Sequence, residues 1–415
     1  MNRVSNGFDV RGRALQAGEL AAWLSEHSLG NRFGLEVVGD GSAYGGTANA
    51  LAIVAADGDG RYIDLAALTP DDEEALASWL ADPGPPKAVH DAKPARHALA
   101  GRGWMLRGVT SDTALAAHLL LPERRSLALN DLLVHHMRCA LPAEAVGPQH
   151  YSDGALILRT CAVLDLADVL DEELARIDSS SLLGRMELPV QQVLTEMEAT
   201  GIAVSAVVPA QVDALVSVAP DGRIHPTFHQ TRTATGRLTS SDPDLDNVPR
   251  LWEAFVAGHD FTGLMTATYR ELDAAIWAHF VDEAAVIEEA RAVGYAASVA
   301  DRRRYLPDLT SKDRSARESA ERSAVAATVE GSAADVVKMA MINIDQALKA
   351  LGLRSRMLLQ AGGELMFEVA DGERETLAEY VLDGMSAAGS GFGLRAEPGC
   401  DFRAGLSPPG SAGDS

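Results

Sequence analysis

The sequence predicts an α/β (α+β) fold that is divided into two or three domains. The chain has 415 residues, which is more than one hydrophobic core usually organises. Near its start, short β-prone runs alternate with Gly-rich turns, and longer helical periodicities follow. A Ser-rich stretch at Asp178 to Leu183 then precedes a second set of helices and strands. We therefore expect a mixed sheet with helices on its faces, followed by a separate domain.

The first domain is expected to begin with a short helical lead from Gly18 to His27. A helix is predicted from Asp71 to Leu80, because acidic residues fill its first turn. Residues 94 to 135 should be mostly helical, and Leu156 to Leu174 has strong helical periodicity. The predicted strands are Phe33 to Val38, Ala48 to Ala55, Arg61 to Leu65 and Lys87 to His90.

The second domain is expected to follow the Ser-rich stretch, which we interpret as a linker. Met186 to Ala199 is predicted to form a helix that ends at Gly201. Loops, further strands and helices, and a helix from Glu373 to Ala388 come next. The tail from Gly405 to Ser415 has the composition of a disordered end.

Charge and cysteine content narrow the class of protein. The chain carries 36 Lys and Arg against 59 Asp and Glu, a net charge of −23, so any contact with nucleic acid requires a local basic patch. Cys139, Cys161 and Cys400 form no CxxC pair, so neither a disulfide framework nor a zinc site is indicated. The sequence shows no apolar run of 18 residues and no signal peptide, which predicts a cytoplasmic protein outside the membrane.

One segment is the strongest indication of a protein family. Thr233 to Pro249 reads TATGRLTSSDPDLDNVP, and it closely resembles the part of family A DNA polymerases that lines the primer-template channel. Three more blocks resemble the same family in the same order: MELPVQQVLTEMEATGI, then RRRYLPDLTSKDRSARESAER with EGSAADVVKMAMINID, then SRMLLQAGGELMFEV. The resemblance implies a bacterial DNA polymerase I type, whose palm domain contains an antiparallel sheet.

The region from Gly34 to Leu174 resembles, more weakly, the RNase H-like 3′-to-5′ exonuclease domain that precedes the palm. Its best matching stretch is HDAKPARHALAGRGWMLRGVTSDTALAAHLLLP. The resemblance implies four parts: an N-terminal lead at 1–30, a degenerate exonuclease-like domain at 31–177, a truncated palm at 178–402 and a disordered tail at 403–415.

The metal-binding positions of the palm depart from the family pattern. Thr268 stands where the D-Y-S-Q-I-E block has its aspartate, and Gly363 stands where the V-H-D-E block has its aspartate. Active members hold two Mg²⁺ ions, which at about 4 Å repel by roughly 4 kcal/mol even at the dielectric constant of water. A hydroxyl and a bare glycine cannot offset that repulsion. We therefore expect no bound metal and no polymerisation.

Nearby carboxylates could in principle compensate for the lost aspartates. Glu364 is expected to point away from Gly363, because residues alternate faces along a strand. Asp273, Glu271 and Glu368 are interpreted as solvated or structural carboxylates.

Two further losses point in the same direction. Fewer than twenty residues separate Gly201 from Asp221, where the family inserts its thumb, and thirteen separate Phe280 from Gly294, where it carries its fingers. The K-x-x-x-Y-G nucleotide-binding motif is missing from the sequence. In the exonuclease-like part Asp112 alone matches the metal-binding pattern, so we expect that domain to be a scaffold.

Basic residues could still contact a duplex. The alternative to DNA contact is a structural role, in which these residues form a solvated turn and ion pairs along a helix face. Glu330 replaces a family glutamine that reads the minor groove, which should weaken binding. The candidate DNA contacts are Arg237, Asn247, Arg302, Arg303, Arg304, Lys312, Arg314 and Arg317.

Three hypotheses therefore remain open. The first is an inactive DNA polymerase I-like protein that retains weak binding to duplex or primer-template DNA. The second is an active polymerase whose metals are held by compensating carboxylates. The third is a protein-interaction module without enzymatic activity. In each case the surfaces left by the missing subdomains could be covered by self-association.

Overall fold

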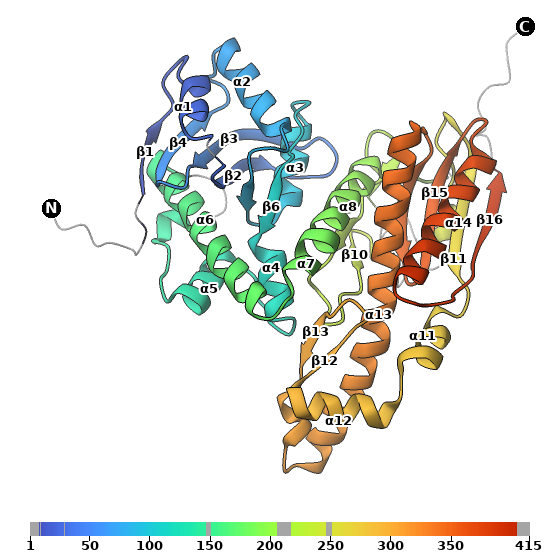
Figure 1. The fold of residues 1–415 in the computed structure, drawn as a ribbon. Helices are drawn as coiled ribbons and strands as arrows, with labels where there is room; N and C mark the ends of the chain where they lie inside the picture. The colour runs from blue at the N-terminus through green and yellow to red at the C-terminus, as the bar shows by residue number, and fades with distance from the viewer. Residues whose placement is uncertain are drawn as a thin grey trace, which may run out of the picture. The chain divides into compact units, whose positions relative to one another are not determined.

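The computed structural model describes residues 8 to 404, apart from positions 9, 29, 147–150, 206–216 and 246–250. The chain divides into two compact units, Met1–Gln191 and Gln192–Ser415. Figure 1 shows each unit as a sheet packed against helices. No helix in the described part of the chain is long and apolar enough to cross a membrane.

The first unit is built on a six-stranded mixed sheet with the order β1-β4-β3-β2-β5-β6. The neighbours β2, β3 and β4 are antiparallel, whereas the β1-β4, β2-β5 and β5-β6 pairs are parallel. The strands are β1 Arg11–Ala14, β2 Phe33–Asp40, β3 Thr47–Val54, β4 Asp59–Asp64, β5 Lys87–Val89 and β6 Val109–Asp112. The mixed sheet predicted from the sequence is confirmed.

The two faces of this sheet are separated by the alternation of side chains along each strand. On one face Phe33 and Leu35 of β2 are buried in an apolar core that also receives the helix residues Trp23 and Trp79. On the other face glycines allow a helix to approach closely. A Cβ atom added to Gly34 would lie only 2.6 Å from the carbonyl oxygen of Thr160.

That closely packed helix is α6, which contacts strands β1 to β5. It begins at a Ser152 cap, whose side chain accepts a hydrogen bond from the Ala155 amide. The helices of this unit are α1 Leu20–Glu26, α2 Pro70–Ala81, α3 Ala92–Ala100, α4 Thr113–Leu120, α5 Leu129–Leu132, α6 Asp153–Arg176 and α7 Ser180–Leu182. Short π-helical turns cover Leu133–Met137 and Leu183–Glu187, and a 3₁₀ turn covers Ala143–Ala145.

Three features differ from the sequence predictions. Strand β1 was not predicted; together with α1 it makes the described part of the N-terminal lead belong to the core of the first unit. Residues 94 to 135 are interrupted by the short strand β6, so they are only partly helical. The Ser-rich stretch Asp178 to Leu183, interpreted as a linker, is largely helical, because α7 continues through a π turn into α8, Leu188–Thr200. Its Leu182 and Leu183 are buried, and this apolar packing fixes the chain as a helix.

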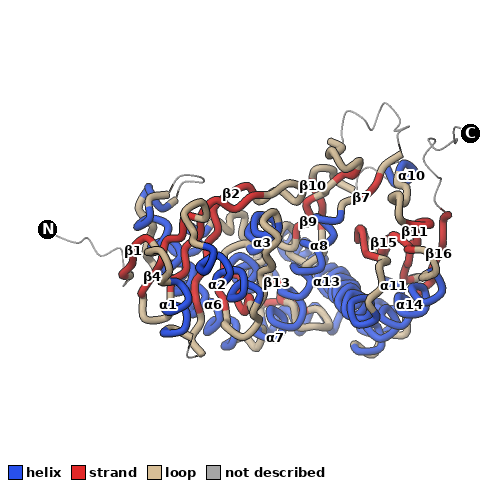
Figure 2. Tube along the Cα trace, turned by 90° about the horizontal axis from the view of Figure 1, so that it is seen from above, coloured by secondary structure: helices blue, strands red, loops and turns tan. Residues whose placement is uncertain are grey.

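The second unit contains a four-stranded antiparallel sheet with the order β14-β15-β11-β16. Helices α13 and α14 gather on one face of it, as Figure 2 shows. The strands of this sheet are β11 Phe261–Tyr269, β14 Arg356–Ala361, β15 Glu364–Ala370 and β16 Pro398–Ala404. An antiparallel palm-like sheet is therefore confirmed.

Short elements complete the second unit. Three two-stranded ribbons pair β7 with β8, β9 with β10, and β12 with β13. These strands are β7 Ile202–Ala203, β8 Arg223–Ile224, β9 Thr227–His229, β10 Thr239–Ser241, β12 Tyr295–Ala297 and β13 Arg303–Tyr305. The helices are α10 Leu251–Ala254, α11 Leu272–Phe280, α12 Glu283–Val293, a 3₁₀ turn Pro307–Thr310, α13 Arg314–Leu351 and α14 Arg374–Gly391.

Helix α13 is the longest element, with 38 residues. The Asp313 side chain caps its start by accepting a hydrogen bond from the Ser315 amide. Gly352 ends it in a left-handed conformation with φ of +64°, which a glycine adopts without steric cost. The helix packs against α14, α11 and α12, so one rigid element reaches most of the second unit.

The predicted thumb deletion and one DNA-contact candidate cannot be followed through the fold. Residues 206–216 between Gly201 and Asp221, residue Asn247, and the tail from residue 405 lie outside the described residues. Helix α8 does end at Gly201, which has φ of +62°, as predicted.

Candidate functional site

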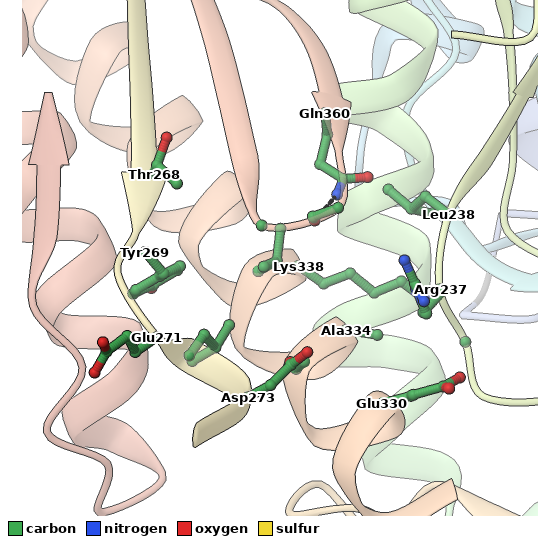
Figure 3. A pocket seen from close by; sticks show the side chains of 16 residues that line it. Arg237, Leu238, Thr268, Tyr269, Glu271, Asp273, Glu330, Ala334, Lys338 and Gln360 are labelled. Atoms are coloured by element: carbon green, nitrogen blue, oxygen red, sulfur yellow. Dashed lines mark hydrogen bonds between the residues drawn. The ribbon is translucent and has the colours of Figure 1, made fainter. Parts of the chain in front are cut away.

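A cavity of about 330 Å³ opens in the second unit where β11, α13 and the β14–β15 turn meet. Figure 3 shows that side chains from these elements, together with Arg237 and Leu238, point around a common space. The lining residues are Gly236, Arg237, Leu238, Thr268, Tyr269, Glu271, Leu272, Asp273, Glu330, Ala333, Ala334, Val337, Lys338, Gln360, Gly362 and Gly363. Both degenerate metal positions predicted from the sequence, Thr268 and Gly363, therefore lie at the same cavity.

Thr268 lies near the end of β11, directly opposite Glu364 of β15. Its Oγ1 donates a hydrogen bond to Glu364 Oε1 at 3.2 Å. Gly363 is not in a strand but in the two-residue turn that joins β14 to β15. The alternation argument that directed Glu364 away from the site is therefore corrected, since it assumed that Gly363 and Glu364 continue one strand. Glu364 interacts with Thr268 directly.

The other nearby carboxylates differ in their surroundings. In Figure 3 Asp273 points into the cavity, whereas the carboxylate of Glu271 turns away from it. Glu271 has a left-handed backbone, with φ of +56°, and it immediately precedes α11. Glu368 is fully buried and pairs with Arg223 and Arg356, each at 2.8 Å, so it is a structural carboxylate as predicted.

These groups do not fit a pair of Mg²⁺ ions. A two-metal centre requires several anionic oxygens that converge on both ions. Here Thr268 and Gly363, the two positions that the resemblance assigns to aspartates, offer one hydroxyl, already hydrogen-bonded to Glu364, and one residue without a side chain. Over the described ranges, no three His, Cys, Asp or Glu side chains are arranged to hold a metal ion.

Two basic side chains line the cavity alongside these acidic ones. Lys338 of α13 is 1% exposed, and Figure 3 shows it reaching toward the exposed side chain of Arg237. Lys338 was not predicted from the sequence. Its spacing could have revealed it, because Glu330, Ala334 and Lys338 recur every four residues and so share one helix face.

Arg302, a candidate DNA contact, has a different role in the structure. It is 6% exposed, and its Nη2 and Nε atoms lie 2.8 Å and 3.0 Å from Asp335 Oδ1. Its guanidinium packs against Gly236, which has φ of +79° and no room for a Cβ atom. This correction has a simple cause: the charge of Arg302 is used to fix the TATGR loop to α13, which leaves it no exposed face for a phosphate.

The remaining basic candidates lie on or near the surface. Arg303 pairs with Asp301 at 2.9 Å and covers the ring of Tyr295, and Arg304 is partly exposed on the same strand. Arg314 pairs with Glu318 at 2.6 Å. Lys312 is exposed, and Arg317 donates to the carbonyl of Ser311 at 2.9 Å. These local pairs match the structural interpretation, while the charges stay close to solvent.

The corresponding site in the first unit is closed. Asp112 is fully buried, and its Oδ1 atom accepts hydrogen bonds from the amides of Asp91, Ala114 and Leu115. Its Oδ2 atom accepts from the amide of Ala92 at 2.8 Å and from Gln191 Nε2 at 2.7 Å. The one aspartate that matches the exonuclease pattern is thus the cap of α4 and a junction between elements of the core.

Its neighbours are also held in structural pairs. Glu36 lies 3.4 Å from Arg159 of α6, and burial raises the pKa of the Glu36 carboxyl. His90 Nδ1 lies 2.8 Å from Thr113 Oγ1. Burial lowers the pKa of His90 to about 4, despite the opposing effect of Asp112, so the imidazole is neutral at physiological pH.

Comparisons with known proteins agree with this architecture. The family model for "DNA polymerase family A" matches residues 203–290 and 282–400, and the model for "DNA polymerase I, ribonuclease H-like domain" matches residues 42–144. A solved structure, the POL domain of Pol1 from M. smegmatis in complex with DNA primer-template and dNTP, superposes with a TM-score of 0.86. It shares 40% identity, covering 95% of this chain and 99% of that one.

This chain belongs to the family A DNA polymerases. The resemblance and the two-part fold predicted from the sequence are both confirmed. DNA polymerase I of Mycobacterium tuberculosis is 38% identical and that of Mycobacterium leprae is 37% identical, each over 93% of the chain. The chain spans 63% of the length of these two relatives.

The alignment also locates a difference within this family. It runs over 573 positions for the M. tuberculosis protein, more than the 415 residues of the chain. The relative therefore contains internal residues for which this chain has no counterpart. The family A fold is present here in a shortened form.

Proposed function

We propose that this family A chain binds primer-template DNA without catalysing nucleotide addition. One observation supports the proposal: Thr268 and Gly363, which the resemblance assigns to the metal positions, line one cavity together with polar side chains. The proposal includes the absence of a two-metal centre.

The charges that line the cavity bear on whether it could hold metal ions. Two Mg²⁺ ions would bring a charge of +4, and the Thr268 position supplies only Glu364, through a hydrogen bond to the hydroxyl. Lys338 and Arg237 add positive charge to the same walls. These two cations offset the carboxylates of Asp273 and Glu330 in the same lining, while Glu271 turns away, so little excess negative charge is left to hold two divalent cations.

The shortened chain supports the same proposal. Between Phe280 and Gly294 the described structure contains only α12, which has 11 residues. The K-x-x-x-Y-G motif, which the family uses to hold the incoming nucleotide, is missing from the sequence. A bound nucleotide would therefore lack its usual contacts even if metal ions were present.

DNA binding is supported by the solved neighbour and by exposed basic residues. That neighbour is a polymerase domain in complex with primer-template. Arg237 is exposed at the cavity, and Arg304, Lys312 and Arg314 lie on or near the surface. Such contacts to phosphates release counterions, so binding should weaken as the salt concentration rises.

A primer-extension assay tests the catalytic part. We expect no extended product with Mg²⁺ and all four deoxynucleotides, while DNA polymerase I of M. tuberculosis extends the same primer. Templated product that exceeds a reaction without enzyme, and an activity that co-purifies with the protein, would contradict the proposal.

Fluorescence anisotropy with a labelled primer-template tests the binding part. We expect Arg237→Ala to weaken binding roughly fivefold at low salt, through the loss of one phosphate contact. Arg176→Ala is a matched control, because Arg176 is an equally simple surface arginine paired with Glu172 in the first unit. An affinity that does not change with salt would exclude phosphate contacts.

An active polymerase with compensating carboxylates is the second candidate. Asp273 points into the cavity and Glu364 lies beside Thr268, so two carboxylates are present near the metal positions. The same extension assay with Mn²⁺ separates the candidates. Product that disappears in Asp273→Asn would support this alternative.

The remaining assignments follow from the family. We assign the exonuclease-like domain, predicted at 31–177, to the first unit, which includes the described part of the lead and extends to Gln191, and we assign the truncated palm to the second unit; the family matches lie within these units. A cytoplasmic location accords with the bacterial DNA polymerases that the chain resembles. Self-association would be detected by sedimentation velocity.

A further inference from the structure

A second hollow of about 570 Å³ lies beside the palm cavity, between α13 on one side and α11 and α12 on the other. Figure 1 shows α11 and α12 flanking α13 within the second unit. The hollow does not belong to the cavity described above, although Asp273 and Glu330 line both. It therefore needs its own explanation.

The wall that α13 contributes is one continuous helix face. Glu318, Glu321, Val325, Val329 and Glu330 line the hollow at helical spacing. From residue 318 to 330 this stripe extends about 18 Å at 1.5 Å per residue. The hollow is therefore a groove about three helical turns long.

The apolar lining residues of the groove, which we call its floor, are partly open to solvent. Trp277 of α11 is 42% exposed, which is unusual for a residue of this size. Ile287 of α12 and Val325 and Val329 of α13 are only partly buried. An apolar strip of this kind gains stability when a second apolar surface covers it.

The charged lining residues of the groove, which we call its rim, are mostly acidic. Five carboxylates and a single guanidinium, that of Arg322, line it. Glu321 and Glu318 pair with Arg291 and Arg314. For Asp273, Glu283 and Glu330, the described part of the chain contains no hydrogen-bonding or ion-pair partner.

We propose that this groove, which we call the α11–α13 groove, binds a basic amphipathic helix of a partner protein. An apolar helix face would cover Trp277 and Val329, and lysines or arginines beside it would meet Asp273, Glu283 and Glu330. The length of the stripe accommodates about three turns of such a helix. This proposal goes beyond DNA binding and does not depend on it.

The charge of the groove decides between possible occupants. A phosphate backbone would face three carboxylates without ion-pair partners in the described part of the chain and a single further guanidinium, that of Arg322, which disfavours nucleic acid. A second copy of this chain carries a net charge of −23, so its average surface is also repelled. A cationic helix gains from both the apolar floor and the acidic rim.

The test uses a labelled 18-residue peptide of leucine and lysine, with leucines at helical spacing, and a second peptide with glutamate in place of lysine. We expect the lysine peptide to bind the full chain and the glutamate peptide to bind at least 20-fold more weakly. Raising the salt concentration should weaken the lysine peptide, because the rim charges are exposed.

Two variants assign the binding to this groove. Trp277→Ala should weaken the lysine peptide at least tenfold, and Glu283→Lys, an exposed change that preserves folding, at least threefold. The matched controls Val293→Ala, at a half-exposed apolar residue of α12 outside the groove, and Glu379→Lys, on α14, should change affinity less than twofold.

Three results would overturn the proposal. Equal binding of the lysine peptide by wild type and Glu283→Lys would show that the rim does not recognise cations. Loss of duplex DNA binding in Trp277→Ala, with the peptide unaffected, would assign the groove to nucleic acid. A wild-type dimer in sedimentation that Trp277→Ala converts to a monomer would assign it to a second copy.

Discussion

The exonuclease-like domain and the palm cavity differ in what surrounds their acidic groups. In the first unit Asp112 is fully buried and receives five hydrogen bonds. In the second unit Asp273 points into an open cavity and has no partner among the described residues. Asp112 is part of the core, whereas the palm cavity has a polar lining that is open to solvent.

The difference shows that the two sites are under different physical constraints. A buried carboxylate is tolerated only when donors surround it, so Asp112 cannot now be replaced without loss of stability. A carboxylate at an open cavity is solvated, so Asp273 can change without that cost. Asp112 is therefore needed for the stability of the fold, whereas Asp273 is accessible to a ligand.

The largest effect is expected for Asp112→Ala. Removal of this carboxylate leaves buried amide donors unpaired and uncaps α4, which should cost about 3 to 5 kcal/mol of unfolding free energy. Chemical denaturation of Asp112→Ala would measure this loss, and denaturation of Asp282→Ala is the matched control. Asp282 caps α12 with the same geometry but on the surface, so about 1 kcal/mol is expected there. Equal losses would contradict the idea that burial distinguishes the sites.

A pH effect of as much as about 3 kcal/mol is expected from His90. Its pKa is about 4 in the folded chain against 6.5 when exposed, so the unfolded chain binds more protons between these values. The free energy of unfolding should therefore fall as the pH drops from about 6.5 to about 4. Denaturation of wild type and His90→Gln across this range would show a smaller fall in the variant. Parallel curves would mean that His90 is not held neutral by the fold.

A change of about 1 kcal/mol is expected when Thr268→Asp and Gly363→Asp are combined. The new aspartate at 268 faces Glu364 across the strand pair, and like charges at such positions destabilise a sheet. Position 363 accepts a side chain, since an added Cβ meets no atom within 4 Å. Mn²⁺ should restore the stability of this double variant and leave wild type unchanged. Thermal melts with and without Mn²⁺ measure this, and stabilisation of wild type by Mn²⁺ would contradict the proposed loss of the metal centre.

The smallest effect is expected for Arg314→Ala. This arginine forms an exposed pair with Glu318 one helical turn away, which stabilises the fold by less than about 0.5 kcal/mol. If Arg314 contacts phosphate, the variant should still lose DNA affinity by a few fold. Anisotropy and denaturation on the same protein separate these roles, and a large loss of stability with unchanged DNA affinity would assign the residue to structure alone.

The sequence predicted the strands and helices whose patterns are regular. Strands β2, β3 and β4 and helices α2, α6 and α14 were all expected near their observed bounds, because apolar periodicity and caps are local signals. Strand β1 was missed, since four residues that include two arginines and a glycine have little strand propensity of their own. Only pairing with β4 makes them a strand.

The site was predicted only in part, because local sequence motifs identify some of its residues but not the contacts between distant ones. Resemblance to the motifs of family A polymerases led to Thr268, Gly363 and Arg237, which the structure brings to one cavity. The burial of Arg302 by Asp335 depends on a contact between residues 33 positions apart, which no local pattern records. The hydrogen bond from Thr268 to Glu364 likewise requires the strand register and the position of the turn.

Helix α13 also sets a rule for how this chain can vary in length. The same uninterrupted helix carries Val329 in the α11–α13 groove, Lys338 in the palm cavity and Asp335 in the pair with Arg302. Each residue of an α-helix is rotated by about 100° around the helix axis relative to the residue before it. One residue inserted between Val329 and Asp335 would swing the groove wall a quarter turn away from the cavity wall, so insertions and deletions in this segment should be far rarer than substitutions.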